Sequence, residues 1–394
     1  MMATPAPARP PLLKDLNERA VLETIRAGGP ISRAEISRRA GISKPTVSLA
    51  LKALLDAGLV RSAEPAEDGP RYGATFFEPD PDAAAVLGLD LGARYLRGGI
   101  SDLSGEVRAR QDLELAGADA RAVLDAAAEL KDRLVEASGL AAERLEAAVV
   151  GVPGVIDASS GRISLAENIH GLEGMAVADD LRRHLGMAVT VENDVNLAAL
   201  GERAKGIARD SEDFAFLSIG TGLGGGLVLR GELHRGHHGA AGEVDYAHGS
   251  GIERSDDPCA EALSSFVAEL AGAGGHATTL KEPFEVPAVF EAARAGDALA
   301  AAAVEEEARR IALHIAPIAA VADVGLVVLG GGIGANGDLL LEPVRAELDS
   351  RLPYPPRVEA SALGDGAVLS GALAVGLEDA LESVFVNRRL SARA

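Results

Sequence analysis

The chain has 394 residues, of which 47% are hydrophobic, and it contains 46 glycines, one cysteine and no tryptophan. This length predicts two or three domains, and the composition is that of a packed α/β protein rather than a disordered chain. The single cysteine, Cys259, excludes an internal disulfide and a zinc site built from several cysteines.

Neither the N-terminal segment nor the longest apolar stretch has the pattern of a signal peptide or a membrane-spanning helix. The start of the chain is rich in Pro and Ala up to Pro11 and lacks the apolar core of a signal peptide. The longest apolar stretch, residues 311–329, is interrupted by His314 and Pro317, so a buried helix followed by a strand explains it better than a membrane span. We therefore expect a cytoplasmic protein with no membrane partner.

The net charge of −21 is unevenly distributed. Residues 1–62 contain ten Lys/Arg and five Asp/Glu, whereas the rest of the chain contains 28 Lys/Arg and 54 Asp/Glu. A basic head on an acidic body can bind phosphates locally while the body repels non-specific contact with nucleic acid.

The first predicted elements are two helices. Apolar residues at helical spacing predict a helix that ends at the Gly-Gly-Pro of residues 28–30. Ser32 and Glu35 then form a capping box, in which each side chain satisfies a free backbone N–H of the other residue. The short helix that begins there is expected to end at Gly41, the residue best able to take a left-handed cap.

A third helix and a hairpin follow. Ser43 is expected to cap this helix, which runs to about Ala57. Residues 60–77, with Asp-Gly-Pro at 68–70, predict a two-stranded wing. Three helices followed by a hairpin predict a winged helix-turn-helix DNA-binding domain over residues 1–77.

The third helix has one apolar face and one polar face. The polar face lies near the helix N-terminus, which in this motif enters the major groove. The residues expected to contact DNA, through phosphates or base edges, are Arg33, Ser43, Lys44, Thr46, Ser48 and Arg71. The alternative is a small protein-interaction bundle with a solvated polar face.

After a charged linker at residues 78–83 the pattern changes to alternating strands and helices over residues 84–394. Two α/β halves, each opening with a strand and a glycine turn, predict a two-lobed fold with a central cleft. We expect lobe I over about residues 84–196 plus the C-terminal helix, and lobe II over about residues 197–375.

Three glycine turns follow apolar strands of this body. They are Asp90-Leu91-Gly92, the Gly/Thr hairpin of residues 218–226, and the glycine run of residues 330–334. Glycine permits close backbone approach to an anion, and in phosphotransferases an Asp-x-Gly turn can hold Mg²⁺ through water. The pattern therefore indicates a phosphate-binding cleft.

A polar block, Val-Glu-Asn-Asp-Val-Asn at residues 191–196, lies between the two predicted lobes. The carboxylate of Asp194 there can accept a proton from a sugar hydroxyl, and the neighbouring amide can hold adjacent hydroxyls. The alternative interpretation is an ordinary Asn/Asp helix cap.

In this order the Asp-x-Gly turn, the Glu-Asn-Asp-x-Asn block, the Gly/Thr hairpin and the late glycine turn resemble the ROK family over about residues 84–380. That family unites bacterial repressors, uncharacterised reading frames and sugar kinases. The resemblance implies an actin-like ATPase fold. It also implies that members with a winged head are dimeric repressors controlled by a sugar or its derivative.

The resemblance also implies roles for individual residues. Asp194 matches the catalytic base, should any kinase activity survive. The matches to sugar-binding positions are Gly154, Asn168, Asn193, Asp194, Glu243 and Glu261. The matches to the ATP loops, expected here to be vestigial, are Asp90, Gly92, Thr221, Gly222, Gly224, Gly331 and Gly332.

Two departures from the family pattern affect cofactors. Ala93-Arg94-Tyr95 replaces the usual Gly-Thr-Lys, and we expect Arg94 to crowd or neutralise the phosphate site. Tyr246 replaces the zinc-binding histidine, and Cys259 remains of the cysteine-rich loop, so the zinc site of the family is lost. We predict no metal site; a site formed by the histidines nearby is the alternative. We also predict that no cofactor is required and that the protein does not depend on ATP and Mg²⁺.

These observations predict a DNA-binding regulator rather than an enzyme. It would repress carbohydrate uptake or metabolism genes, bind operator DNA and a small carbohydrate effector, and form a homo-oligomer, either a dimer or a dimer of dimers. The alternatives are an ATP-dependent sugar kinase and a non-enzymatic interaction protein with a vestigial cleft.

Overall fold

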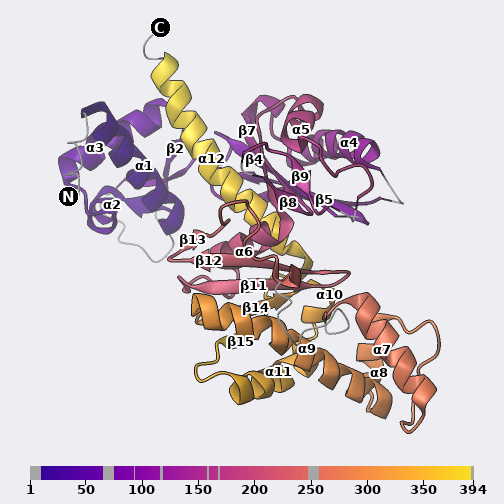
Figure 1. The fold of residues 1–394 in the computed structure, drawn as a ribbon. Coiled ribbons are helices and arrows are strands. Elements are labelled where there is room, and N and C mark those ends of the chain that lie inside the picture. The colour runs from indigo at the N-terminus through magenta and orange to yellow at the C-terminus, as the bar shows by residue number, and fades with distance from the viewer. Residues whose placement is uncertain are drawn as a thin grey trace.

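The computed structural model describes residues 10–64, 75–92, 94–115, 119–157, 159–166, 169–246 and 257–391. Figure 1 shows a small N-terminal head, two stacked α/β lobes, and a long C-terminal helix, α12 (Ala367–Ser391), that runs from the lobes to the head. Within these residues, no helix has the length and apolarity needed to cross a membrane.

The head is three helices against a small antiparallel sheet whose strand order is β1-β3-β2. Its elements are α1 (Pro10–Gly28), β1 (Ile31–Ser32), α2 (Arg33–Ala40), α3 (Lys44–Asp56), β2 (Val60–Ala63) and β3 (Phe76–Pro79). Apolar side chains from all three helices, such as Val21, Ile36 and Leu51, form one core with Phe77 of β3. This is the winged helix-turn-helix architecture that the sequence predicted.

The second and third helices begin at the serines that were predicted to cap them. Ser32 Oγ accepts from the Glu35 N–H at 3.3 Å, and Ser43 Oγ accepts from the Thr46 N–H at 3.4 Å. The reciprocal half of the capping box is wrong. The Glu35 carboxylate instead accepts from the side chains of Arg38 and Arg39, because these guanidiniums lie one turn further along the same helix.

The boundary between head and linker differs from the predicted one. β3 continues to Pro79, and Glu78 lies opposite Arg61 of β2, with Arg61 Nε 2.7 Å from Glu78 Oε1. The first two residues assigned to the linker therefore belong to the sheet, because strand pairing holds them. The turn predicted at residues 68–70 lies outside the described residues.

The body contains two five-stranded sheets with the same topology. The first, in the order β10-β7-β4-β5-β6, is built from β4 (Ala85–Leu91), β5 (Tyr95–Asp102), β6 (Val107–Glu114), β7 (Leu145–Val152) and β10 (Val189–Asn193). The second, in the order β13-β12-β11-β14-β15, is built from β11 (Phe214–Ile219), β12 (Leu223–Leu229), β13 (Glu232–Leu233), β14 (Leu326–Gly330) and β15 (Arg357–Ala360).

In each sheet the first three strands form an antiparallel meander, and the fourth and fifth pair in parallel on the other side of the first. This repetition confirms the two-lobed α/β fold. A two-stranded hairpin, β8 (Val155–Ile156) with β9 (Ile163–Ser164), extends the first lobe. The apolar stretch at residues 311–329 is the second half of α9 followed by a buried strand, as predicted. The helix is largely buried up to Ile315, but its last turn reaches the surface, where Val321 is 88% exposed.

Helices cover both faces of each sheet. On the first sheet, α4 (Ala120–Ser138) packs on one face and α12 on the other, with α5 (Val177–Leu185) beside α4. On the second, α6 (Asp194–Lys205) covers one face. The opposite face is covered by α7 (Ala260–Ala273), α8 (Val286–Arg294), α9 (Ala298–Ala322) and α11 (Gly337–Arg351), and the short α10 (Gly331–Gly334) follows β14.

Helix α12 connects the interior of the lobes to the head. It crosses α6 so closely that a Cβ added to Gly201 would lie 2.2 Å from the Ala367 carbonyl oxygen. Further along, Leu377 and Leu381 join the apolar core of the head. Arg26 of α1 also donates through Nε to the Leu103 carbonyl of lobe I at 2.9 Å. The head is therefore docked on the body rather than suspended from a linker.

Candidate sugar-binding cleft and DNA-binding face

The polar block lies where β10 ends and α6 begins. Asn193 is the N-cap of α6, because its Oδ1 accepts from the Asn196 N–H at 2.9 Å. Its Nδ2 donates to the Gly154 carbonyl at 3.0 Å. The helix-cap interpretation is thus correct for Asn193, and the same amide places the Gly154 loop beside Asp194.

Gly154 has a backbone conformation that requires glycine. Its φ is +94°, and an added Cβ would lie 2.5 Å from the carbonyl oxygen of Ser164. The loop that follows β7 therefore passes close over the β8–β9 hairpin, with its backbone held against α6 by Asn193. This fixes one wall of the predicted sugar site.

Asp194 occupies the first position of α6 and accepts from the Val195 N–H at 2.9 Å. Burial, together with the negative charge of Asp90, raises the pKa of Asp194 to about 7. A carboxyl group that titrates near neutral pH can accept a hydrogen bond from a sugar hydroxyl when it is ionised and donate one when it is protonated. This chemistry suits either a proton acceptor or a hydroxyl-binding group.

An ion pair that sequence reasoning missed joins the two lobes beside Asp194. Arg235, which follows β13, donates through Nε to Glu192 Oε2 of β10 at 2.6 Å. The other carboxylate oxygen of Glu192 accepts from Asn196 Nδ2 at 2.9 Å. Glu192 belongs to the motif, but only the tertiary fold brings Arg235 to it from the other lobe.

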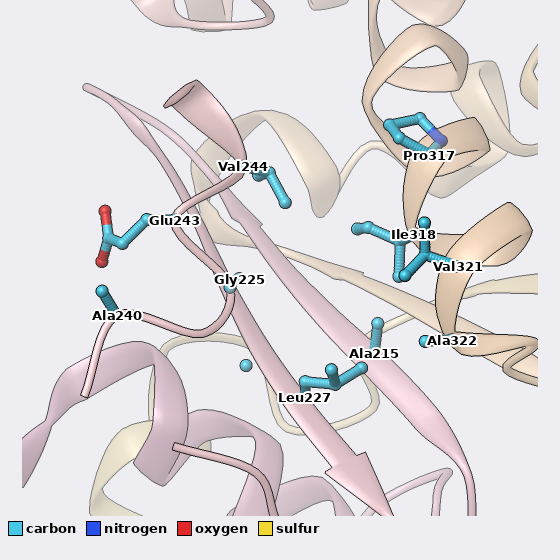
Figure 2. A pocket seen from close by; sticks show the side chains of 12 residues that line it. Ala215, Gly225, Leu227, Ala240, Glu243, Val244, Pro317, Ile318, Val321 and Ala322 are labelled. Atoms are coloured by element: carbon cyan, nitrogen blue, oxygen red, sulfur yellow. The ribbon is translucent and has the colours of Figure 1, made fainter. Parts of the chain in front are cut away.

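Glu243 lies in a loop that runs over β12. Burial raises the pKa of Glu243, and the nearby charge of Asp245 acts in the same direction. Figure 2 shows a pocket of about 300 Å³ between this loop and the end of α9, with the Glu243 carboxylate directed away from Ile318 and Val321. Apart from Glu243 its side chains are apolar, so this pocket offers few groups that could bind sugar hydroxyls.

The second and third glycine turns meet each other and the start of α6. An added Cβ on Gly224 would lie 2.8 Å from Val195 Cγ2, and one on Gly331 would lie 2.3 Å from the Ile219 carbonyl oxygen. Gly332 follows Gly331 in α10. The strand β12 already begins at Leu223, so Gly224 is a strand residue, whereas Thr221 and Gly222 form the exposed turn itself.

The first glycine turn carries an unexpected cation. Asp90 and Arg97 are partners across β4 and β5, and Arg97 Nη1 lies 3.3 Å from Asp90 Oδ2. Burial raises the pKa of Asp90 to about 6 although the charge of Arg97 opposes that rise. The Gly92 N–H closes the turn on the Tyr95 carbonyl at 2.9 Å.

Arg97 also lies near Asp112 and Asp365, at 3.8 and 3.7 Å, which holds the guanidinium among three carboxylates.

The expectation that Arg94 crowds or neutralises the phosphate site is wrong. Its side chain is 76% exposed and pairs with Glu114 at 3.4 Å, because this edge of the β5–β6 hairpin faces away from Asp90.

The structure leaves two of the predicted residues untested and places a third, Glu261, away from Asp194. Asn168 and Arg71 lie outside the described residues. Glu261 is exposed in the first turn of α7, which begins where the Ala260 N–H donates to the Gly220 carbonyl at 2.8 Å. Glu261 therefore adjoins the Gly/Thr turn, and no contact within the described part of the chain joins it to Asp194.

The implied zinc site does not fit these residues. Tyr246, at the position of the implied histidine, is 66% exposed, and Cys259 is the N-cap residue of α7. Burial raises the pKa of the Cys259 thiol, which disfavours the thiolate that zinc binds. A single thiol with a raised pKa cannot replace a set of cysteine ligands.

The described residues predicted to contact DNA lie on α2 and on the N-terminal half of α3. Lys44 and Arg33 are exposed, whereas the predicted hydroxyls are engaged locally. Ser43 Oγ lies 2.8 Å from Thr46 Oγ1, and Ser48 Oγ donates to the Lys44 carbonyl at 2.9 Å. Leu49, which the sequence analysis did not select, is 72% exposed on the same helix and is suited to apolar contact with a thymine methyl group.

Known proteins resemble both parts of this chain. The xylose repressor of Caldicellulosiruptor bescii is 27% identical and aligns over 94% of this chain and 97% of its own length. The crystal structure of a ROK family transcriptional regulator, a homolog of the E. coli MLC protein, superposes with a TM-score of 0.78 at 22% identity, covering 95% of this chain and 98% of that one.

A kinase resembles the body without the head. The ROK family glucokinase of Streptomyces griseus, solved with glucose and AMPPNP, superposes with a TM-score of 0.63 at 26% identity and covers 74% of this chain and 99% of its own. The MarR family model matches residues 15–69, within the head. The ROK family model matches residues 86–378, which is well over half of the chain, and the protein therefore belongs to the ROK family, with the actin-like sugar-kinase fold and a winged helix-turn-helix head.

Proposed function

We propose that this protein is a transcriptional repressor of carbohydrate genes. Its affinity for operator DNA would change when a sugar binds between its lobes. The observation that carries this proposal is that one chain joins a winged head to a polar cleft through a packed helix, α12. The name of the xylose repressor, aligned over nearly the whole chain, supports the same function.

The coupling between cleft and head follows from the packing of two helices. Asp194 is the first residue of α6, and α6 packs along α12 through the Gly201 crossing. The far part of α12 contributes Leu377 and Leu381 to the core of the head. A sugar that draws the two lobes together would shift α6. Because α6 packs on α12, the shift would change the orientation of the head relative to the lobes. Such a ligand acts through different affinities for the two arrangements.

We propose further that the cleft works without ATP and Mg²⁺. The Arg97 guanidinium already pairs with Asp90, the carboxylate that would hold hydrated Mg²⁺, and a fixed positive charge at that carboxylate opposes binding of a second cation. The residues therefore do not fit a hydrated Mg²⁺ ion at this turn, and the kinase alternative is weaker for that reason. A coupled ADP-release assay over hexoses, pentoses and N-acetyl sugars should give no turnover above background.

A repressor of this kind would act in the cytoplasm as a homo-oligomer. Winged helix-turn-helix proteins commonly read two half-sites of a palindrome, which requires two heads. We propose a dimer or a dimer of dimers, to be checked by light scattering on the pure protein.

The direct test is binding to DNA fragments from around the protein's own gene and adjacent sugar-transport operons, measured by fluorescence anisotropy at moderate salt. We expect one fragment to bind specifically and its affinity to change when a sugar is added. The names of the relatives make xylose and glucose the first sugars to try. Lys44→Gln should weaken DNA binding and reduce its salt dependence, whereas Lys281→Gln, in lobe II, should not. The proposal fails if no fragment binds.

A further inference from the structure

We propose that Asp245, Asp257 and His314 form a binding site for one divalent transition-metal ion such as Zn²⁺ or Mn²⁺. Each residue offers one donor atom, and the three atoms lie within 4.8 Å of one another. The three donors come from different parts of lobe II, namely the 3-10 helix at Val244–Tyr246, the segment before α7, and the middle of α9. They differ from the cysteine and histidine ligands that the family resemblance implies.

His314 is the strongest element of this site. The residue is 1% exposed, and its Nδ1 lies 2.9 Å from the Arg310 carbonyl oxygen. Because a carbonyl oxygen only accepts, Nδ1 carries the hydrogen and Nε2 of the neutral ring presents a lone pair. Nε2 is fully buried and has no hydrogen-bond partner among the residues that the structure describes. A hydrogen bond from one ring nitrogen to a carbonyl oxygen is the usual way in which a metal-binding histidine is oriented.

The lone pair of His314 points toward a carboxylate. Nε2 lies 3.6 Å from Asp257 Oδ1, which is itself buried and finds no hydrogen-bond partner within the described part of the chain. Two acceptor atoms at that distance repel each other unless a cation or a proton lies between them. In a tetrahedral zinc site two such ligands lie about 3.4 Å apart, so a metal ion fits between these atoms with little movement.

The charge and type of the donors indicate the class of ion. Two carboxylates balance a divalent cation, and imidazole with carboxylate suits zinc and manganese, whereas a softer ion would require thiolates. Cys259 does not belong to the donor group, although it is only two residues from Asp257. Water would complete the coordination of the ion.

A bound ion would fasten the loop that carries Glu243. Asp245 is two residues from Glu243, and His314 is a buried residue of α9. Binding to the folded chain alone stabilises that chain by mass action. The ion would therefore raise the melting temperature, and it would hold one wall of the cleft in place.

The test uses the full-length protein, stripped with a chelator and then titrated with Zn²⁺ or with Mn²⁺ by calorimetry, with melting temperature as the second readout. We expect one ion per chain for one of these metals and a rise in melting temperature. Asp257→Asn keeps the shape of the side chain and should weaken the binding of the ion by about tenfold or more. His314→Gln should abolish binding of the ion. If this substitution of a buried residue prevents folding, the result for Asp257→Asn tests the proposal.

The matched control is His237→Gln with His238→Gln, which removes an exposed histidine pair whose rings are 4.5 Å apart in the same lobe. This variant should bind the ion as the original protein does. The proposal is overturned if the original protein binds neither metal at one per chain, or if Asp257→Asn binds as tightly as the original. It is equally overturned if the control variant loses the ion, since the surface pair would then be the ligand.

Discussion

Leu381 provides the sharpest test of the path from cleft to head. Its side chain is 2% exposed in the core that α12 shares with α1 and α3. Truncation of a buried leucine to alanine typically costs about 2–5 kcal/mol. Allosteric coupling between two sites is typically about 1–3 kcal/mol, so Leu381→Ala removes packing energy at least as large as the coupling that it would transmit.

The expected result is a head that binds DNA but no longer responds to sugar. Operator affinity of Leu381→Ala would be measured by anisotropy with and without the sugar that shifts the original protein, and sugar binding would be measured separately by calorimetry. Sugar affinity should be nearly unchanged, because Leu381 belongs to the core of the head, while the sugar-dependent shift in operator affinity should fall to within about twofold of none.

The control is Leu348→Ala in α11, where the leucine is also fully buried but belongs to the core of lobe II. It should lower the melting temperature by a comparable amount and leave the sugar response intact. If Leu381→Ala keeps the full sugar response, α12 is not the path, and the coupling argument is wrong.

Three further outcomes follow from the cleft. Burial raises the pKa of Asp194 to about 7, and the ionised carboxylate accepts a hydrogen bond from a sugar hydroxyl. Sugar affinity, measured by calorimetry, should therefore fall as pH is lowered through about 7. The affinity of Asp194→Asn should not change over the same range. Gly154→Ala, at φ +94° with a carbonyl oxygen 2.5 Å from the added carbon, should weaken sugar binding by tenfold or more, about 1.4 kcal/mol, in the same assay, and equal affinity would refute the role of this wall. Arg97→Ala should bind Mg²⁺-nucleotide measurably better than the original protein, and no change in a nucleotide titration would show that Arg97 is not the barrier.

Much of this architecture was predictable because it depends on local rules. The Ser32 and Ser43 caps act within a few residues, so they mark the starts of α2 and α3 in the sequence itself. Apolar strands that end in glycine turns likewise predict the two α/β halves of the body. The motif around Asp194 also left a helix cap open as its alternative interpretation, and Asn193 is indeed the N-cap of α6.

The sequence by itself determined the helices and hairpin of the head, the alternating strands and helices of the body, and which residue types could meet a sugar or a phosphate. Only the tertiary structure decided the partners of the charged groups: Arg97 rather than Arg94 faces Asp90, Arg235 reaches Glu192 from the other lobe, and His314 lies against Asp257. The physical reason is range. Capping and periodicity act over a few residues, whereas an ion pair between distant positions depends on how strands pair and lobes pack, which no local pattern records.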